Sequence, residues 1–387
     1  MERTMPKILI LHASLGTGHK SAAEALGAAF EQFGAEVRVE DTLDHCSPVV
    51  AKALNAYYLQ TSEKGPKLYK AFYEASDKGG FEDAFSMNRL IGVIGGPLLR
   101  ELDALVDRVN PDAIICTHQI PLQLLVARKQ RGEIQTPLYV VVTDYVAHST
   151  WFAPEVSGYF VPSELTRNMM VKRGAPSAAV CVTGIPVNLC ISEEKPVSLM
   201  RQRHNLPDEA ALISLFGGGI EAERVRNIVV ELLEMPTPAT LVVVAGRNAE
   251  LLPALEGIES SASVQLIKHE RIDYVDDLVA ACDLVITKAG GLIVSEILAR
   301  GTPMIIIDPL PGQEEWNADM VAAAGAGVQL RMAEMVPAAV GHLVGQIDAL
   351  MSMRRQAQRI GRPRAAIEAA EKVLADIAFV TGRQDTR

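Results

Sequence analysis

The sequence lacks an apolar run long enough to cross a membrane and an amino-terminal segment of the kind that directs secretion. None of its apolar runs approaches the roughly 18 residues that a membrane-spanning helix needs. Met1–Pro6 carries Glu2 and Arg3 and leads directly into a strand-like run, which is not the layout of a signal peptide. These absences predict a soluble, cytoplasmic protein.

Cysteine is scarce, and its spacing carries no metal or disulfide signature. The five cysteines include no Cys-x-x-Cys pair and no zinc-type spacing. They are therefore interpreted as reduced thiols of a cytosolic protein. The sequence predicts no metal site and no bound cofactor.

The sequence also lacks an excess of basic residues. Its net charge is −10, whereas a general nucleic-acid binder normally presents a basic face, so we expect no nucleic-acid partner. The charge is uneven, because residues 1–190 carry a net charge of −2 and residues 191–387 carry −8. The first half is therefore better suited to approach an anionic lipid surface.

What the sequence does contain is a regular alternation of short β-branched runs and helix-length amphipathic segments. Over 387 residues this pattern predicts two α/β domains built on parallel sheets. Strands are expected near 7–14, 37–43, 111–118, 136–144, 158–161, 179–184, 211–216, 240–245, 264–268, 283–287 and 304–308. Helices are expected near 20–33, within 47–75, and near 87–109, 119–131, 222–234, 271–281, 291–300, 315–324, 338–352 and 364–380.

The rhythm of strands and helices restarts after Ile185-Pro186-Val187, and this restart divides the chain. We expect a first domain over residues 1–190, a second over 191–363, and a last helix with its tail over 364–387. The polar stretch 191–208 is interpreted as the linker.

Residues 50–100 interrupt the alternation with a long segment that is helical in pattern. The segment holds seven of the chain's nineteen aromatic residues, and lysines lie between them. Two interpretations remain open. The segment either rests on a membrane interface or lines an apolar acceptor channel, or it forms a helical subdomain with a small core of its own.

A glycine-containing loop, residues 14–19, follows the first expected strand. Its glycines allow a sharp turn and let a substrate approach the backbone. His19 lies where the next helix begins, and a neutral imidazole there could take a proton from a hydroxyl group while the helix dipole keeps its pKa from rising. The alternative is a histidine that only caps or packs the turn.

A second polar cluster, residues 143–151, follows a later strand of the first half. Because parallel strands end at one edge of a sheet, this loop, the loop after His118 and the loop with His19 should meet there. Asp144 could orient an imidazole or bind a hydroxyl group, and Trp151 could stack on a sugar or a lipid glycerol. The histidine spacing does not support a zinc site.

In the second half, glycine-rich turns follow successive strands. Gly217-Gly218-Gly219 and Ala245-Gly246-Arg247-Asn248 are interpreted as phosphate-contacting turns, and Gly290-Gly291 opens a helix whose N–H groups suit a diphosphate. Glu296, one turn further along, could accept hydrogen bonds from both ribose hydroxyls. The loop with Gln313-Glu314 could bind sugar hydroxyls.

Several of these segments resemble known enzymes. Ser14-x-Gly16-x-Gly18-His19-x-x-Ala22-Ala23, Thr143-Asp144-Tyr145-x-x-His148-x-x-Trp151 and Thr183-Gly184-Ile185-Pro186-Val187 resemble the amino-terminal domain of monogalactosyldiacylglycerol synthases and bacterial processive diacylglycerol glucosyltransferases. The donor domain of glycosyltransferase family 28 resembles the second half, through Lys288-x-Gly290-Gly291, Ser295-Glu296 and Pro311-Gly312-Gln313-Glu314-Glu315-x-Asn317. The resemblance runs from about residue 7 to residue 330.

The resemblance implies an α/β protein of the GT-B fold, with two Rossmann-like domains facing each other across a cleft and a last helix that crosses back to the first. It implies inverting transfer of a hexose from UDP-galactose or UDP-glucose to membrane diacylglycerol, without a metal site for the nucleotide sugar. The first domain would bind diacylglycerol, and the second would bind the UDP-sugar.

On the matching residues, the resemblance implies that His19 is the general base, with Asp144 and His148 as helpers on the acceptor side. The acceptor site would be lined by Gly16, Gly18, Tyr145 and Trp151. The donor site would be formed by Gly217, Gly218, Gly219, Arg247, Lys288, Gly290, Gly291, Glu296, Gln313 and Glu314.

Two departures from the family pattern concern the donor site. Where the family has a further glycine after the glycine turn, this chain has Ile220-Glu221, and a carboxylate beside a diphosphate is unfavourable unless it points away. The family's Lys-Pro-Gly-Gly is here Lys288-Ala289-Gly290-Gly291. The alternatives are a GT-B enzyme acting on another lipid-linked or soluble acceptor, and a nucleotide-sugar-binding protein without catalysis.

Overall fold

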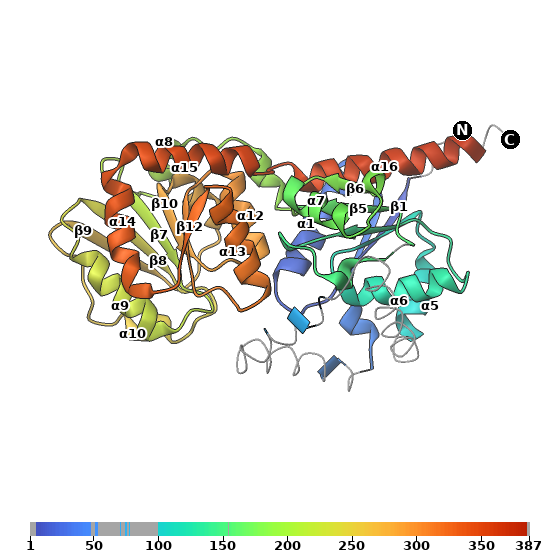
Figure 1. Ribbon diagram of the computed structural model, residues 1–387, viewed down its shortest axis with the longest axis horizontal. Helices are drawn as coiled ribbons and strands as arrows, with labels where there is room; N and C mark the ends of the chain where they lie inside the picture. The colour runs from blue at the N-terminus through green and yellow to red at the C-terminus, as the bar shows by residue number, and fades with distance from the viewer. Residues whose placement is uncertain are drawn as a thin grey trace. The chain divides into compact units, whose positions relative to one another are not determined.

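The computed structural model describes residues 5–47, 51–52, 70, 74–75, 77, 100–153 and 155–384. The chain divides into two compact units (Figure 1). The first unit comprises Met1–Ser192, Pro311–Gln313 and Arg362–Arg387, and the second comprises Glu193–Leu310 and Glu314–Gly361. The segment near 50–100, for which the sequence left two interpretations, lies almost wholly outside the described residues.

The described part of the first unit is built on a six-stranded parallel sheet in the order β2-β1-β3-β4-β5-β6. Its strands are β1 (Lys7–His12), β2 (Glu36–Asp41), β3 (Ala113–Cys116), β4 (Leu138–Val141), β5 (Gly158–Val161) and β6 (Val180–Val182). Along β1, Ile8 and Ile10 pack on one face of the sheet, and Leu9 and Leu11 pack on the other. An unbroken apolar run is therefore needed, because helices cover both faces.

Helices cover both faces of this sheet. Five are described, namely α1 (Gly18–Gln32), α5 (Arg100–Val109), α6 (Gln119–Gln130), α7 (Glu164–Lys172) and α16 (Ala365–Gln384). Helices α5, α6 and α7 contribute to one core cluster, whereas α1 and α16 share the other. The last helix therefore belongs with the first unit, against α1.

The second unit repeats the plan with a six-stranded parallel sheet in the order β12-β11-β10-β7-β8-β9. Its strands are β7 (Ala211–Phe216), β8 (Ala239–Val244), β9 (Val264–His269), β10 (Leu284–Thr287), β11 (Met304–Ile307) and β12 (Gly327–Leu330). Strand β12 and the short helix α10 (Leu251–Ala254) were not predicted from the sequence.

The helices of the second unit also lie on both sides of its sheet. They are α8 (Val197–Arg203), α9 (Ala222–Leu233), α11 (Val275–Ala281), α12 (Gly291–Ala299), α13 (Gln313–Ala323), α14 (Val336–Gly345) and α15 (Ile347–Ile360). The single helix predicted near 338–352 was wrong. Gln346 adopts a non-helical conformation (φ −121°, ψ 81°) after Gly345, so two helices form.

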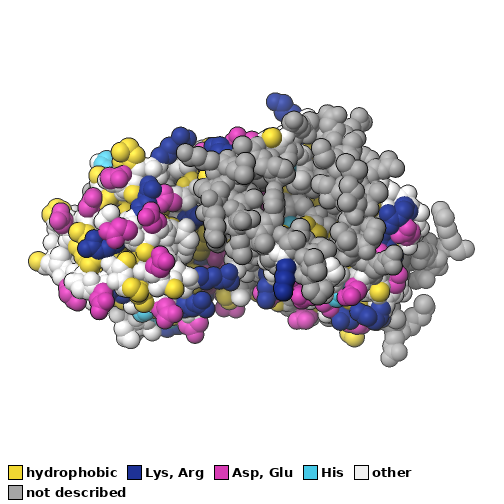
Figure 2. Space-filling view, turned by 90° about the horizontal axis from the view of Figure 1, so that it is seen from below, with side chains coloured by type: hydrophobic (Ala, Val, Ile, Leu, Met, Phe, Trp, Pro, Cys, Tyr) yellow, Lys and Arg dark blue, Asp and Glu magenta, His cyan; other side chains and the backbone are white. Residues whose placement is uncertain are grey.

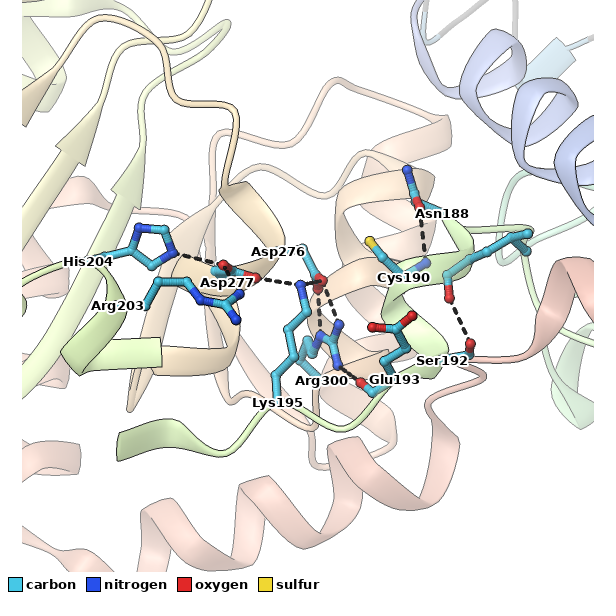
Figure 3. Close-up of polar contacts among 11 residues, drawn as sticks. Asn188, Cys190, Ser192, Glu193, Lys195, Arg203, His204, Asp276, Asp277 and Arg300 are labelled. Atoms are coloured by element: carbon cyan, nitrogen blue, oxygen red, sulfur yellow. Dashed lines mark hydrogen bonds and ion pairs between the residues drawn. The ribbon is translucent and has the colours of Figure 1, made fainter. Parts of the chain in front are cut away.

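The stretch 191–208 was predicted as a linker, and this was wrong as well, because the stretch is a structured part of the second unit. It contains α8, which packs against α11. Figure 3 shows Lys195 directed at the carboxylates of Asp276 and Asp277 at the start of α11. The same Asp277 also pairs with His204 Nε2 at 2.8 Å. The charged side chains of 191–208, which had suggested a solvated linker, instead form ion pairs that hold this stretch against the second unit.

The side chains on one face of the second unit are mixed in type. On the face of the second unit seen in Figure 2, acidic, basic and apolar side chains are interspersed. No helix within the described ranges combines the length and the apolar character that crossing a membrane requires.

We predict that Asp277→Asn destabilises the second unit by about 2 kcal/mol at pH 7, because Lys195, Arg203 and His204 then lose their shared anion. Although burial opposes ionisation of Asp277, these partners hold its pKa below the usual range. The carboxylate therefore stabilises the fold above about pH 4 and loses this effect as the pH falls. Urea unfolding at pH 7 and at pH 3 measures the difference.

The matched control is Asp273→Asn, which removes an exposed aspartate shortly before the same helix. We expect it to change the stability by less than about 0.5 kcal/mol. Equal effects of the two substitutions, or a difference that does not shrink at pH 3, would contradict the role given to Asp277.

Candidate active site

His19 occupies the first turn of α1, at the carboxyl edge of the first unit's sheet. β1 ends at His12, and the loop turns through Gly16, whose φ of +91° a residue with a side chain rarely adopts. Gly18 then begins the helix. The predicted loop thus turns directly from strand to helix and brings His19 next to the ends of the neighbouring strands.

Two oxygen atoms from other strand ends lie against the His19 imidazole. Its Nδ1 is 2.8 Å from the main-chain oxygen of Thr117, directly after β3, and 2.9 Å from Oγ1 of Thr143, after β4. The Thr117 hydroxyl in turn donates to the main-chain oxygen of His19 at 2.9 Å. Both threonines are buried.

Aromatic rings complete the surroundings of His19. The His118 ring lies at 4.5 Å between centroids with an interplanar angle of 73°, and the Trp151 ring lies at 6.4 Å. Burial lowers the pKa of His19 to about 4, with His12 acting in the same direction and the Thr117 carbonyl opposing it. The imidazole is therefore neutral near pH 7 and able to accept a proton.

The other two strand-end histidines cap helices. His118 Nδ1 accepts from the Ile120 N–H at 3.0 Å and caps α6, and His148 Nδ1 accepts from the Thr150 N–H at 3.1 Å at the turn Ser149–Trp151. Both imidazoles are buried. Across the described ranges, no group of three or more His, Cys, Asp or Glu side chains is arranged to hold a metal ion.

The expected acceptor-side residues lie deeper than the sequence suggested. Trp151 is 0% exposed and belongs to the core cluster beside α6, so its ring is part of the wall behind His19 and not a surface for stacking. Tyr145 is also buried, and its main-chain oxygen accepts from Thr166 Oγ1 at 2.7 Å. Asp144 is 3% exposed and, within the first unit, accepts from Gln313 Nε2 at 2.8 Å. Gln313 was expected among the donor-binding residues.

The glycine turn of the second unit is held from one side by a neighbouring loop. Gly217 directly follows β7, and a Cβ at this position would lie only 2.2 Å from the Leu251 side chain. Gly219 has a φ of +74°, which residues with a side chain rarely adopt. Asn248, after β8, donates through Nδ2 to the main-chain oxygens of Gly217 (3.1 Å) and Ile220 (2.8 Å). Asn248 lies in the turn that was predicted to contact phosphate, but only the preceding Arg247, which is exposed, was named as a donor-binding residue.

Lys288 approaches the same turn from β10. Its Nζ is 3.4 Å from the main-chain oxygen of Gly219 and 3.6 Å from Glu314 Oε2. Glu314 also accepts from the Leu310 N–H at 2.6 Å, and its Oε1 lies 3.7 Å from where a Cβ on Gly290 would stand. The structure thus brings together the glycine turn, Lys288, Gly290 and Glu314. The sequence had predicted each of them as a donor-site residue.

Glu296 lies on α12, which begins at Gly291. Its side chain is partly buried, and burial together with the nearby charge of Asp276 raises its pKa to about 7. A carboxyl group with this pKa is poised between two protonation states near neutral pH, so it can accept or donate hydrogen bonds.

The two residues of the departure Ile220-Glu221 differ in burial. Ile220 is 3% exposed and packs in the core, and Glu221 is exposed. Glu221 nevertheless acts on Asp308, whose pKa is raised chiefly by burial while Arg224, 3.0 Å away, opposes the shift. Asp308 has a φ of +44°, a strained conformation for a residue other than glycine.

Comparison with solved structures assigns the fold class. The chain is similar to MurG of Acinetobacter baumannii, with 15% identity, a TM-score of 0.61 and coverage of 96% of this chain and 99% of that one. It is also similar to CalG4, described as the calicheamicin glycosyltransferase, with 14% identity, a TM-score of 0.63 and coverage of 98% and 100%. The two Rossmann-like units are those of the GT-B fold, which confirms the expected class.

Comparison of sequences assigns the family. Residues 19–187 match the monogalactosyldiacylglycerol (MGDG) synthase family, and residues 212–376 match the glycosyltransferase family 28 C-terminal domain. A Bacillus mycoides (strain KBAB4) protein named processive diacylglycerol beta-glucosyltransferase is 30% identical, covering 96% of this chain and 94% of its own. The chain belongs to this family of MGDG synthases and processive diacylglycerol glucosyltransferases, and it is a glycosyltransferase.

We predict that Glu296→Gln makes the protein more stable than the wild type at pH 8, by about 1–2 kcal/mol, and leaves it little changed at pH 5. Because the folded-state pKa of Glu296 is raised to about 7, ionisation above that pH is costly in the folded protein only. Glutamine mimics the neutral form. Thermal unfolding at the two pH values measures the effect.

Glu231→Gln on α9 is the control, because it removes an exposed glutamate from the same unit. A Glu296→Gln variant that is no more stable than the wild type at pH 8 would show that the carboxyl group ionises without cost.

Proposed function

We propose that this glycosyltransferase moves a hexose from UDP-galactose or UDP-glucose to 1,2-diacylglycerol and forms a β-glycosyldiacylglycerol with inversion. The observation that carries the proposal is His19, a neutral imidazole at the mouth of α1 in the unit that matches the MGDG synthases. UDP-glucose is the first donor to test, because the Bacillus mycoides relative is named a glucosyltransferase.

In the proposed reaction, His19 takes the proton of the acceptor's free glycerol hydroxyl. The hydroxyl oxygen attacks the anomeric carbon of the sugar as the bond from that carbon to the UDP oxygen breaks. Attack from the face opposite UDP inverts the configuration and converts an α-linked donor to a β-glycoside. The proton moves to His19, and the bonding electrons leave with UDP, so the step balances.

The departing UDP is stabilised in the proposal by the second unit. The N–H groups at Gly217, Gly218 and Gly219 and at the start of α12, Gly290-Gly291, would contact the diphosphate. Lys288 supplies a cation beside the glycine turn. A carboxyl group on α12, Glu296, suits the ribose hydroxyls, and Arg247, which directly precedes Asn248, is proposed as a further cation.

Sugar recognition is assigned to Gln313 and Glu314, whose amide and carboxylate suit hydroxyl groups. On the acceptor side, Gly16 and Gly18 leave the backbone accessible next to His19, and Asp144 and His148 are its proposed helpers. No metal or cofactor takes part in the proposal.

A lipid acceptor requires contact with a membrane. We propose that the protein binds peripherally to the surface of the bilayer, where anionic lipids would contribute to the attraction. Liposome flotation tests this part separately. Transfer to a soluble acceptor without any binding to liposomes would favour the alternative of a soluble or other lipid-linked acceptor.

We predict that His19→Ala lowers the rate of hexose transfer to diacylglycerol by about 10²–10⁴-fold, since the reaction loses its general base. The assay uses labelled UDP-glucose and UDP-galactose with diacylglycerol in mixed micelles, and mass spectrometry identifies the product. The control is His342→Ala, which removes an exposed histidine on α14 of the second unit.

Robust transfer by the His19→Ala variant would remove His19 as the base. Tight binding of UDP by the wild type without turnover on any acceptor would instead favour a nucleotide-sugar-binding protein without catalysis. The departure Ile220-Glu221 is the feature that favours this alternative.

We further predict that Asn248→Ala raises the KM for the UDP-sugar about tenfold, because the glycine turn loses the two hydrogen bonds that hold its carbonyls. Binding of UDP measured by calorimetry should weaken by a similar factor. Asn227→Ala, an exposed asparagine on α9, is the control. Unchanged donor affinity in Asn248→Ala would show that the turn keeps its shape without this side chain.

A further inference from the structure

We propose that Thr117 and Thr143 are positioning residues that hold His19 with its proton on Nδ1, so that Nε2 is the atom that takes the acceptor's proton. This inference rests on the proposed function, because it names the atoms that perform its proton transfer. It concerns two residues to which the sequence analysis gave no role.

The main-chain oxygen of Thr117 determines the tautomer. It carries no proton and can only accept, and it lies 2.8 Å from His19 Nδ1. Because burial keeps the imidazole neutral, the ring has one proton to place. A hydrogen bond at this distance therefore puts the proton on Nδ1 and leaves a lone pair on Nε2.

Thr143 contacts the same nitrogen from another strand end. Its Oγ1 lies 2.9 Å from Nδ1, so the Nδ1–H is shared between the Thr117 carbonyl and the Thr143 hydroxyl. A ring rotated by half a turn would present a carbon atom to both oxygens and lose both contacts. Two acceptors on one N–H thus fix the orientation of the ring as well as its tautomer.

Thr117 also holds the main chain of His19. Its hydroxyl donates to the His19 carbonyl at 2.9 Å, and its own N–H donates to the Leu11 carbonyl of β1 at 3.0 Å. Thr117 is 0% exposed. The start of α1 and the imidazole are therefore both tied to one residue that the sheet itself fixes.

Both partners of Nδ1 are uncharged, which distinguishes this base from an imidazole paired with a carboxylate. Among the described residues, His12 acts on the pKa of His19 and the His118 ring contacts it, and burial lowers the pKa of both, so they remain neutral near pH 7. The imidazolium formed during transfer would keep both contacts at Nδ1, with a carbonyl dipole and a hydroxyl group.

The first test reads the tautomer directly. Nitrogen-15 NMR of histidine-labelled protein, with the His19 signals assigned by their loss in His19→Ala, distinguishes protonated from unprotonated ring nitrogens. We expect a protonated Nδ1 and an unprotonated Nε2 at pH 7. A proton on Nε2 overturns the inference whether or not the protein transfers hexose.

The second test uses the hydroxyl groups. Thr143→Val and Thr117→Val should each lower kcat about 10- to 100-fold with little change in the KM for the UDP-sugar, and each serine variant should restore most of the loss. Thr240→Val, a buried threonine of β8, is the matched control and should leave kcat unchanged. Thermal unfolding checks that each variant is folded.

The outcomes separate the two proposals. Valine variants that are folded and fully active would overturn the positioning role even if His19→Ala is inactive. A wild-type protein that transfers no hexose to any lipid would contradict the proposed function, whereas the NMR result would still decide the tautomer. Failure of serine to restore kcat would show that the valine variants act through packing, which also overturns the inference.

Discussion

The parallel pairing of β1 with β3 is the constraint on which the first unit's site depends. Leu11 is in register with Cys116, so the residue that follows β3 stands beside the end of β1. His19 and Thr117 are 98 positions apart in the chain, yet the imidazole and the carbonyl are 2.8 Å apart. This short distance is set by the register of the two strands, and not by the loop between β1 and α1. A change of register between these two strands would therefore separate His19 from Thr117, and it would also move the apolar side chains of the strand to the other face of the sheet.

The second unit uses strand order to the same end. β7 lies between β10 and β8 in the sheet, so the chain leaves β7 at the point where the order of the strands reverses. The glycine turn follows β7, Asn248 follows β8, and Lys288 follows β10. An amide and an ammonium group thus reach the turn from strands on opposite sides of β7. Open α/β sheets bind ligands at such a reversal, because the loops on either side diverge and leave room above the central strand.

The alternation of strands and helices and the positions of the strand ends could be predicted from the sequence. Contacts made by main-chain atoms could not. Alternating apolar runs placed His19, the glycine turn and Lys288 at strand ends correctly. The Thr117 carbonyl carries no residue-specific signal, since every residue has one, and the capping bonds of His118 and His148 depend on backbone angles that spacing does not reveal. Trp151 was expected to stack on a sugar or a lipid glycerol, but its ring is buried in the core. The linker prediction for 191–208 was wrong because it rested on the charged side chains of this stretch. The sequence does not show that they pair with carboxylates on α11.

The two units distribute charge in opposite ways, and the chemistry of the proposed reaction explains why. The partners of His19 are a carbonyl, a hydroxyl and neutral rings. The imidazole therefore stays neutral, and in the proposal it can accept a proton. Around the glycine turn, Lys288 is paired with Glu314 and Arg224 with Asp308. A diphosphate needs cations, and in the described structure each of these two cations has a carboxylate partner. Because Glu314 also accepts from the Leu310 N–H, it can yield Lys288 to an incoming phosphate and keep one hydrogen bond.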